Sequence, residues 1–522
     1  MRFQVLILCE HKYLSLEKVL KFEIIRLKKC EKSKLFAWKS VFLHSVNVRN
    51  RRMLKRKMEE TLLRWKNSVN HNPLVIKGIR QCGKTYIVQQ FAKANYANTV
   101  YVNFVLQPER ISAFTGSKDV DVILMNLSTM MPGAKFVPNE TCIILDEIQD
   151  CPDARTALKS FKLDGRFDVI ATGSLLGVKG YGAVQKRKNN SELGKNSIPV
   201  GYETIVEMYP LDFEEFLWAN GIRAEVIDLL RTCLKEERPI PEGIHQTLMQ
   251  LLYRYVAVGG LPEVVNKFLE TKHFGQVSKV FQSIISEYED DMMKYADDQE
   301  KPHIRECFES IPKQLAKEYK KFQYSVVQKG GRASDFLGSL QWLEDAGVIR
   351  RCYNTTITEL PLEGNAIGDC FKVYVSDIGL LVAMLDPGTR TDILQGNLHG
   401  YKGAIFENLV ADFLGKKGQK LYYFHKDSGL ELDFLIRYQG ECVPLEVKAK
   451  SGKAKSLTTV LKNTEHYHVT KALKFGNYNI GREGPLLTLP LYMVFLLDFE
   501  DDNNINMEDI DIDEVNRMVI GM

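Results

Sequence analysis

A short apolar run leads directly into a glycine-rich loop sequence near residue 80. Leu74, Val75 and Ile76 are typical of a buried strand in a parallel sheet. The next eight residues, GIRQCGKT at 78–85, fit the pattern G-x-x-x-x-G-K-[ST] at each fixed position. Glycines in such a loop let backbone N–H groups surround phosphates at the N-terminus of the following helix. The order of strand, loop and helix therefore predicts an α/β domain that binds a nucleoside triphosphate.

Two side chains at the end of the loop carry specific chemistry. Lys84 is expected to reach the outer phosphates as a point charge, and the Thr85 hydroxyl is expected to ligate Mg²⁺. The other loop residues expected to contact the nucleotide are Gly78, Arg80, Gln81, Cys82 and Gly83. The alternative is a glycine turn that matches the pattern by chance, and the flanking strand and helix argue against it.

A second apolar run ends in two adjacent acids. Residues 141–145, TCIIL, are typical of a buried strand, and Asp146 and Glu147 follow directly. At the end of such a strand one acid can hold Mg²⁺ through water and the next can polarise the attacking water. We assign these two roles to Asp146 and Glu147, in that order. The alternative is a polar cap on the strand.

Two further strand-like runs extend the predicted sheet. Residues 99–104 show the alternating or continuous apolar pattern of a strand. Residues 167–171 form another such run, and Thr172-Gly173-Ser174 follow it directly. Strands separated by helices favour right-handed crossovers in a parallel sheet, with ligands at the carboxyl ends of the strands. A hydroxyl there can sense the γ-phosphate, and either Thr172 or Ser174 would serve.

Four segments together resemble a known family. GIRQCGKT, ILDEIQD, ATGSLLGV and YPLDFEEFLWANG are similar to the AAA-type ATPases of bacteria and archaea that carry a winged-helix segment and a restriction-endonuclease-like C-terminal domain. The resemblance covers residues 53 to about 498. It implies ATP rather than GTP, and the sequence contains no guanine-reading N/T-K-x-D motif.

The resemblance also implies an arginine supplied across a subunit interface, and hence a homo-oligomer. Arg187 is the arginine in the expected stretch, within the polar loop KRKNN at 186–190. A solvated loop explains Arg187 equally well. Similar chains often show Gly-Arg where this one has Gly201-Tyr202, so the arginine finger stays open.

The pattern in the middle of the chain predicts first a helical region and then a winged helix. Residues 211–299 show helical spacing of apolar residues, with the acidic run EYEDD at 287–291 read as a solvated helix face. Residues 311–354 are typical of two helices followed by a wing strand at 348–353. Basic residues in this segment suit phosphate contacts with DNA. They are Lys313, Lys317, Lys320, Lys321, Lys329, Arg332, Arg350 and Arg351. A protein-interaction role for such a module stays open.

A second chemical pattern lies near the C-terminus. ELDFLI at 431–436 and VPLEVK at 443–448 are separated by a turn at Gln439-Gly440, as in a hairpin. Asp433, Glu446 and Lys448 fit the D…E-x-K core of restriction-endonuclease-like folds. Two carboxylates on one face can hold Mg²⁺, and the lysine can lower the pKa of an attacking water.

Glu407, on an amphipathic helix expected at 404–414, would be a further acid of this site. Activity does not follow from the fold, because a fold retained for binding need not keep its chemistry. An active nuclease and an inactive binding module both stay open.

Charge is distributed unevenly along the chain. Residues 1–52 hold 13 Lys/Arg against 4 Glu, whereas the remaining residues hold 57 basic and 62 acidic side chains. We hypothesise that the natural chain begins at Met53, where an amphipathic helix pattern opens. The alternative is a basic arm that touches nucleic acid or membrane. No apolar run approaches the roughly 18 residues of a membrane span, so a cytoplasmic protein without a membrane partner is expected.

These predictions combine into an α/β protein that binds ATP and Mg²⁺. Its fold class is a P-loop AAA-type parallel-sheet core, a helical and winged-helix middle, and an α/β restriction-endonuclease-like C-terminal domain. The expected divisions are a basic leader (1–52), the ATPase core (53–220), a helical region (221–300), the winged helix (301–360), the nuclease-like domain (361–498) and an acidic tail (499–522). The expected function is ATP hydrolysis coupled to nucleic acid, or a nucleotide-gated switch with an inactive nuclease fold.

Overall fold

The computed structural model describes residues 53–174, 201–295, 300–317, 321–397, 401–449 and 454–499. The basic leader, Arg187 and all of the acidic tail except residue 499 lie outside the described residues. The predictions made for those parts of the chain stay predictions.

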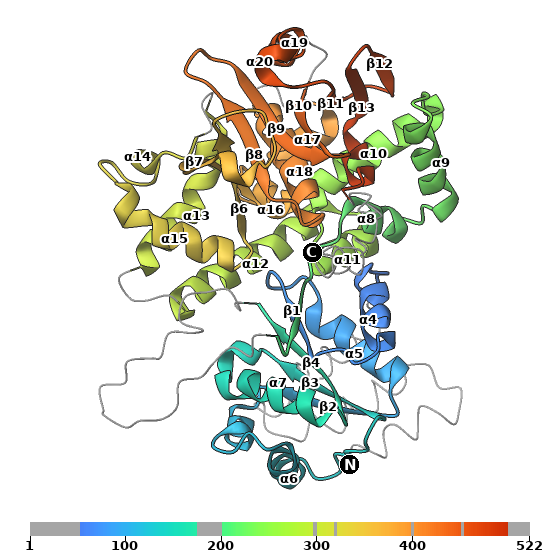
Figure 1. Ribbon diagram of the computed structural model, residues 1–522, viewed down its shortest axis with the longest axis vertical. Helices are drawn as coiled ribbons and strands as arrows, with labels where there is room; N and C mark the ends of the chain where they lie inside the picture. Colours follow the sequence, from blue (N-terminus) through green and yellow to red (C-terminus); the bar gives the residue numbers. More distant parts are fainter. Residues whose placement is uncertain are drawn as a thin grey trace, which may run out of the picture. The chain divides into compact units, whose positions relative to one another are not determined.

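The glycine-rich loop follows one strand, β1, of a five-stranded parallel sheet (Figure 1). Its strands are β1 (Leu74–Lys77), β2 (Asn98–Asn103), β3 (Thr141–Asp146), β4 (Asp168–Gly173) and β5 (Thr204–Glu207). The order β2-β3-β4-β1-β5 places β4 between the loop strand β1 and the acidic strand β3, and every neighbouring pair is parallel. The predicted parallel-sheet core is confirmed.

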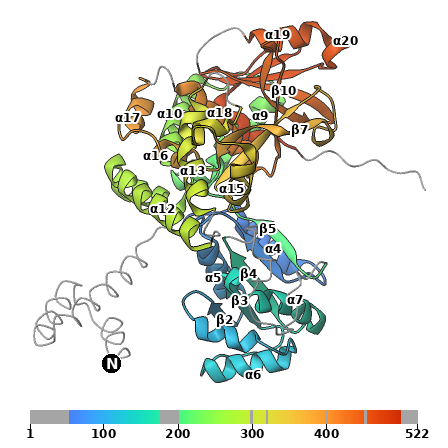
Figure 2. The same ribbon diagram turned by 90° about the vertical axis from the view of Figure 1, so that its left-hand side faces the viewer.

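Helices cover both faces of this sheet. Alternate residues of β3 face opposite sides, so that Ile144 packs in the same core as α5 (Lys84–Asn95) and Ile143 packs with α6 (Val120–Met130) and α7 (Pro152–Asp164). Figure 2 shows α5 and α7 on opposite sides of β3 and β4. Because both faces of the sheet are buried, the sequences of these strands are continuous apolar runs.

The expected helical pattern begins after the sheet. The helices are α8 (Phe213–Ala219), α9 (Ala224–Lys235), α10 (Glu242–Val258), α11 (Pro262–Thr271), α12 (Phe274–Tyr295), α13 (Lys301–Leu315), α14 (Tyr324–Val327) and α15 (Ala333–Asp345). They follow α4 (Met58–Asn67), which precedes the first strand.

The strand expected as a wing is part of a larger sheet. β6 (Ile349–Thr355) pairs antiparallel with β7 (Ala366–Val375) and parallel with β8 (Leu421–His425). The boundary expected at residue 360 therefore divides two neighbouring strands of one sheet.

The C-terminal sheet has eight strands in the order β12-β13-β11-β10-β9-β8-β6-β7. Its further strands are β9 (Glu431–Tyr438), β10 (Glu441–Val447), β11 (Ala472–Gly476), β12 (Gly481–Glu483) and β13 (Leu486–Pro490). The helices of this region are α16 (Ile378–Ala383), α17 (Thr389–Gln395), α18 (Lys402–Lys416), α19 (Lys455–Lys462) and α20 (Thr464–Tyr467). β9 and β10 form an antiparallel hairpin whose turn is Gln439-Gly440, as predicted.

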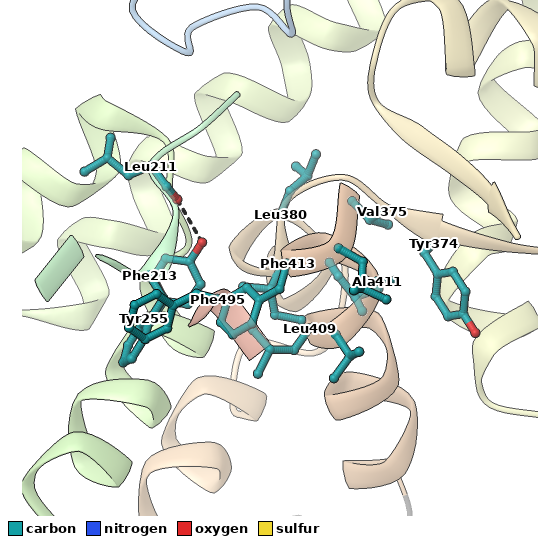
Figure 3. Close-up of a cluster of buried hydrophobic side chains, with 14 of the residues drawn as sticks. Leu211, Phe213, Tyr255, Tyr374, Val375, Leu380, Leu409, Ala411, Phe413 and Phe495 are labelled. Carbon is teal, nitrogen blue, oxygen red and sulfur yellow. Dashed lines mark hydrogen bonds between the residues drawn. The ribbon is translucent and has the colours of Figure 1, made fainter. Parts of the chain in front are cut away.

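A cluster of aromatic rings joins the helical middle to the C-terminal region (Figure 3). Phe213 of α8 packs against Tyr255 of α10, Phe413 of α18 and Phe495, with ring centroids 5.5 to 6.1 Å apart. The buried Tyr255 hydroxyl donates to the Leu211 carbonyl at 2.8 Å. The two regions therefore share one core.

Candidate functional site

The glycine-rich loop has a backbone that few other residues could adopt. Gly78 has φ 153°, and a Cβ at this position would lie 2.1 Å from the Met208 carbonyl oxygen. Gly83 has φ 96° and directly precedes α5. Both positions require glycine, for close approach and for backbone conformation. The loop thereby presents the N-terminus of α5, a favourable place for phosphate.

Lys84 is held inside this loop. Its side chain is buried, with 7% exposed, and Nζ donates to the carbonyls of Gly78 at 2.7 Å and Ile79 at 3.1 Å. A buried ammonium whose partners are neutral carbonyls keeps its full charge available to an anion. The loop, the lysine and the helix N-terminus therefore fit a triphosphate.

The sheet brings the expected Mg²⁺ ligands together. Thr85 Oγ1 donates to Asp146 Oδ1 at 2.9 Å, although the two residues are 61 positions apart. Asp146 is only 2% exposed. A hydroxyl and a carboxylate at this separation fit a shared Mg²⁺ ion.

Two polar residues of β2 also hold Asp146, and sequence reasoning missed both. The Tyr101 hydroxyl donates to Oδ2 at 2.7 Å, and Asn103 Nδ2 donates to the same oxygen at 2.8 Å. Burial, together with the hydrogen bond to Asp146, raises the pKa of Tyr101. The signal was present in the alternation of residues 99–104, which puts Tyr101 and Asn103 on one face beside the next strand.

Glu147 has a left-handed backbone, with φ 55°. Such a conformation costs on the order of 1 kcal/mol in a residue other than glycine, and it recurs at functional sites. Gln149 Nε2 donates to Glu147 Oε2 at 2.6 Å, and Ser174 Oγ lies 3.5 Å from the same oxygen.

The two candidate sensor hydroxyls have different partners. Thr172 is fully buried and donates to Asp146 Oδ1, whereas Ser174 faces Glu147. Since the sequence left both open, the structure supplies a distinction: Ser174 lies beside the expected base and Thr172 beside the expected metal acid.

An arginine that precedes α4 supports the loop from its other side. Arg56 donates to the Cys82 carbonyl at 2.9 Å and to the Tyr209 carbonyl at 2.6 Å, and its Nε lies 3.1 Å from Glu215 Oε1. Sequence reasoning missed this residue, because its partners lie 26 to 159 positions away in the chain.

The acidic run at 287–291 is not solvated throughout, so that interpretation was wrong for Glu287 and Asp291. Asp291 of α12 is only 6% exposed and forms an ion pair with Arg80 of the loop. Glu287, one helical turn earlier, accepts from Gln81 Nε2 at 2.5 Å. Helical spacing of four residues places both acids on the side of α12 that meets the loop.

The C-terminal hairpin brings its three expected residues to one end of β10. Asp433 Oδ2 accepts from the Val447 backbone N–H at 2.8 Å, and Glu446 forms an ion pair with Lys448. Burial raises the pKa of Glu446, and the charge of Lys448 offsets part of this rise. Within the described residues, Glu446 Oε2 is buried without a hydrogen-bond donor in reach. This oxygen fits a cation.

Glu407 is tied to a residue that sequence reasoning missed. Lys372 of β7 is 1% exposed, and its Nζ donates to Glu407 Oε1 at 3.1 Å and to Glu431 Oε1 at 2.6 Å. The Tyr374 hydroxyl also donates to Glu407. Burial lowers the pKa of Lys372, but the surrounding carboxylates more than offset this effect, so its pKa is raised. A lysine inside the otherwise apolar run FKVYV was the signal for this cluster.

The chemistry of these donors favours Asp433 and Glu446 as the pair that could hold Mg²⁺. Glu407 is already neutralised by an ammonium. Across the described ranges, no group of three or more His, Cys, Asp or Glu side chains is arranged to hold a metal ion. Among the described residues, the predicted acids therefore offer at most two carboxylates to a cation, Asp433 and Glu446, of which Glu446 is paired with Lys448, while Glu407 is paired with Lys372.

Two of the basic residues expected to contact DNA are half-buried and have partners within the chain. Arg351 pairs with Glu344 of α15, and the Arg350 guanidinium lies 5.0 Å from the centre of the Tyr209 ring. Both arginines line a cavity that also includes Gly78 and Ser174. Lys320 lies outside the described residues.

One family model covers the segment that contains the first site. Residues 70–217 match the model of an AAA domain. With the strand order given above, this segment is an AAA-type ATPase domain. The match spans the loop, Asp146, Glu147 and Ser174. The AAA-type domain therefore coincides with the five-stranded sheet.

Two further stretches of the chain match families of unknown function. Residues 249–391 match a domain of unknown function (DUF8612), and residues 402–492 match another (DUF4143). No curated protein matches the chain.

Solved structures resemble parts of this fold at low identity. The Walker-type ATPase PABY2304 of Pyrococcus abyssi is 14% identical with a TM-score of 0.37, and the match covers 64% of this chain and 96% of that one. The Aeropyrum pernix Orc1 protein in complex with DNA is 12% identical with a TM-score of 0.25, covering 66% and 91%. The Thermotoga maritima RuvB Holliday junction branch migration motor is 13% identical with a TM-score of 0.25, covering 57% and 90%. Scores this low support no functional inference.

Among the helices of the described ranges, none combines the length and apolar character needed to cross a membrane.

Proposed function

We propose that this chain is a Mg²⁺-dependent ATPase that acts with or on nucleic acid through its C-terminal region. The observation that supports it most is the convergence of Lys84, Thr85, Asp146 and Glu147 at the carboxyl edge of one parallel sheet. Each of these side chains has the chemistry that phosphoryl transfer requires at that position.

The residues divide the reaction as follows. Lys84 and the loop N–H groups bind the phosphates, and Thr85 and Asp146 hold Mg²⁺, which supplies charge neutralisation on the phosphate oxygens. Glu147 accepts a proton from the attacking water. Ser174 orients that water or senses the γ-phosphate, since it lies 3.5 Å from Glu147.

ATP turnover in such a site also needs a cation at the transferred phosphoryl group, so we infer a homo-oligomer in which a second copy contributes an arginine. Arg187 is the residue that sequence position favours. The measurement is phosphate release per chain across a range of protein concentrations, with and without DNA. We expect the rate per chain to rise with concentration and with added DNA. A rate that is constant under both changes would contradict the shared site and the nucleic-acid partner.

The C-terminal region, in this proposal, is a winged helix joined to a restriction-endonuclease-like domain. Support comes from the β9–β10 hairpin and the parallel pairing of β10 with β11, with Asp433, Glu446 and Lys448 at one end. One cation held by the two carboxylates would activate water for attack on a phosphodiester, with Lys448 stabilising the charge that develops.

A second candidate function is a nucleotide-gated switch whose nuclease fold only binds. The Lys372 ammonium favours this alternative, because it neutralises Glu407 and Glu431 where an active site would use acids for metal.

Plasmid nicking distinguishes the two candidates. Under the first, we expect the wild-type protein to nick supercoiled DNA with Mg²⁺ or Mn²⁺, and Asp433→Ala and Glu446→Ala to lose about 100-fold or more of this activity, as loss of a metal-based step implies. Asp427→Ala, an exposed acid in the turn before β9, is the matched control. Intact ATP hydrolysis without nicking under either metal would favour the switch.

A further inference from the structure

The phosphate loop is held by the acidic side of α12. Arg80 forms an ion pair with Asp291, and Gln81 donates to Glu287 at 2.5 Å. Between these acids, the Tyr288 hydroxyl donates to the Arg80 carbonyl at 3.1 Å. Three contacts within little more than one turn of α12 therefore join this helix to two loop residues.

The Arg80 side chain also lies beside Ser174, one of the residues expected to act in hydrolysis. Arg80, Asp291 and Ser174 line the same small cavity. Burial by itself lowers the pKa of Arg80. The hydrogen bond and the charge of Asp291, with smaller contributions from Glu147 and Glu287, more than offset this effect, so the pKa of Arg80 is raised. The charged guanidinium therefore shares a cavity with the expected sensor, Ser174.

ATP would bring a second anion to this guanidinium. The planar fork of arginine fits carboxylate and phosphate oxygens equally well, with two parallel hydrogen bonds in each case. Meanwhile the carboxylates of Glu287 and Asp291 repel a triphosphate in the loop. Asp291 and the terminal phosphate thus compete for one cation.

We propose that Arg80 exchanges Asp291 for the terminal phosphate of ATP, and that this exchange releases α12 from the phosphate loop. The inference rests on the ATP binding proposed above and adds a residue that distinguishes ATP from ADP. The same side of α12 is packed in the main core through Phe281, Ile284 and Tyr288, so a change at Asp291 directly affects buried contacts of that core.

Binding of ATP and ADP to charge-neutral variants tests the exchange. Isothermal titration with Mg²⁺ should show that Asp291→Asn tightens ATP binding by about threefold to tenfold, with a smaller effect on ADP, since an ion pair no longer competes. Arg80→Ala should weaken ATP binding about tenfold and ADP binding less. Asp290→Asn is the matched control, because Asp290 is the exposed neighbour on the same helix and carries the same charge. It should stay within about twofold of wild type for both nucleotides.

Equal shifts for ATP and ADP, or an Asp291→Asn protein that binds ATP no better than Asp290→Asn, would overturn the exchange.

Hydrogen exchange in the wild-type protein provides a second measurement, with Arg80→Ala as its control. A non-hydrolysable ATP analogue should increase amide exchange in α12 relative to ADP, and the increase should be absent in Arg80→Ala. A bound analogue that leaves α12 unchanged overturns this inference alone. A wild-type protein that binds neither nucleotide overturns the proposed function, and the exchange with it.

Discussion

Replacement of Lys84 by alanine is expected to abolish measurable ATP binding. The ammonium is buried in the loop at 2.7 Å from the Gly78 carbonyl, at the position where phosphate oxygens would be bound. Loss of charged hydrogen bonds to phosphate costs about 3 kcal/mol, which is about 100-fold in affinity. Equilibrium binding of a fluorescent ATP analogue measures the effect directly.

Lys93→Ala is the matched control for this substitution. Lys93 lies on the same helix, α5, with an exposed side chain, so its removal changes the net charge equally without touching the loop. Thermal unfolding of both variants establishes that the fold is retained. Wild-type affinity in folded Lys84→Ala protein would exclude the loop as the nucleotide site.

Replacement of Glu147 by glutamine is expected to separate binding from turnover. The glutamine side chain keeps the size of glutamate and one acceptor oxygen but cannot accept a proton from water. General-base catalysis contributes about 10²- to 10⁴-fold, so phosphate release should fall by at least about 100-fold. ATP affinity should be retained, because Lys84 and the loop backbone are unchanged.

Single-turnover phosphate release and equilibrium binding, measured on the same preparation, give both quantities. Glu140→Gln, an exposed acid that directly precedes β3, makes the same chemical change away from the site and should leave the rate unaltered. Undiminished phosphate release by Glu147→Gln would remove Glu147 from the role of base.

The core of the AAA-type domain was predictable because its signals are local. The residues of β1, β3 and β4 are consecutive apolar runs, and each ends in its functional side chains, so position in the chain also predicts position at the sheet edge. The C-terminal hairpin was predictable for a similar reason, since a two-residue turn joins its strands.

The partners of charged residues were not predictable in the same way. The run EYEDD has the composition of a solvent-exposed face, and only the packing of α12 against the loop removes Asp291 from water. Likewise Lys372 and Glu407 lie on separate elements, β7 and α18, and meet because both elements contribute to one core. The position of a charged residue in the sequence does not indicate which distant residue it pairs with.

The sequence by itself determined that a phosphate loop, two acids and two hydroxyls would meet at one edge of a parallel sheet. Each of these side chains lies at or just after the end of a strand, and the ends of parallel strands lie at the same edge. Only the tertiary structure decided which of them are paired. It placed Thr172 with Asp146 and Ser174 with Glu147, it held Arg80 against Asp291, and it placed an ammonium among the C-terminal acids. The physical reason is that the strands and their direction follow from short-range patterns, whereas the pairing of buried charges depends on contacts between segments far apart in the chain.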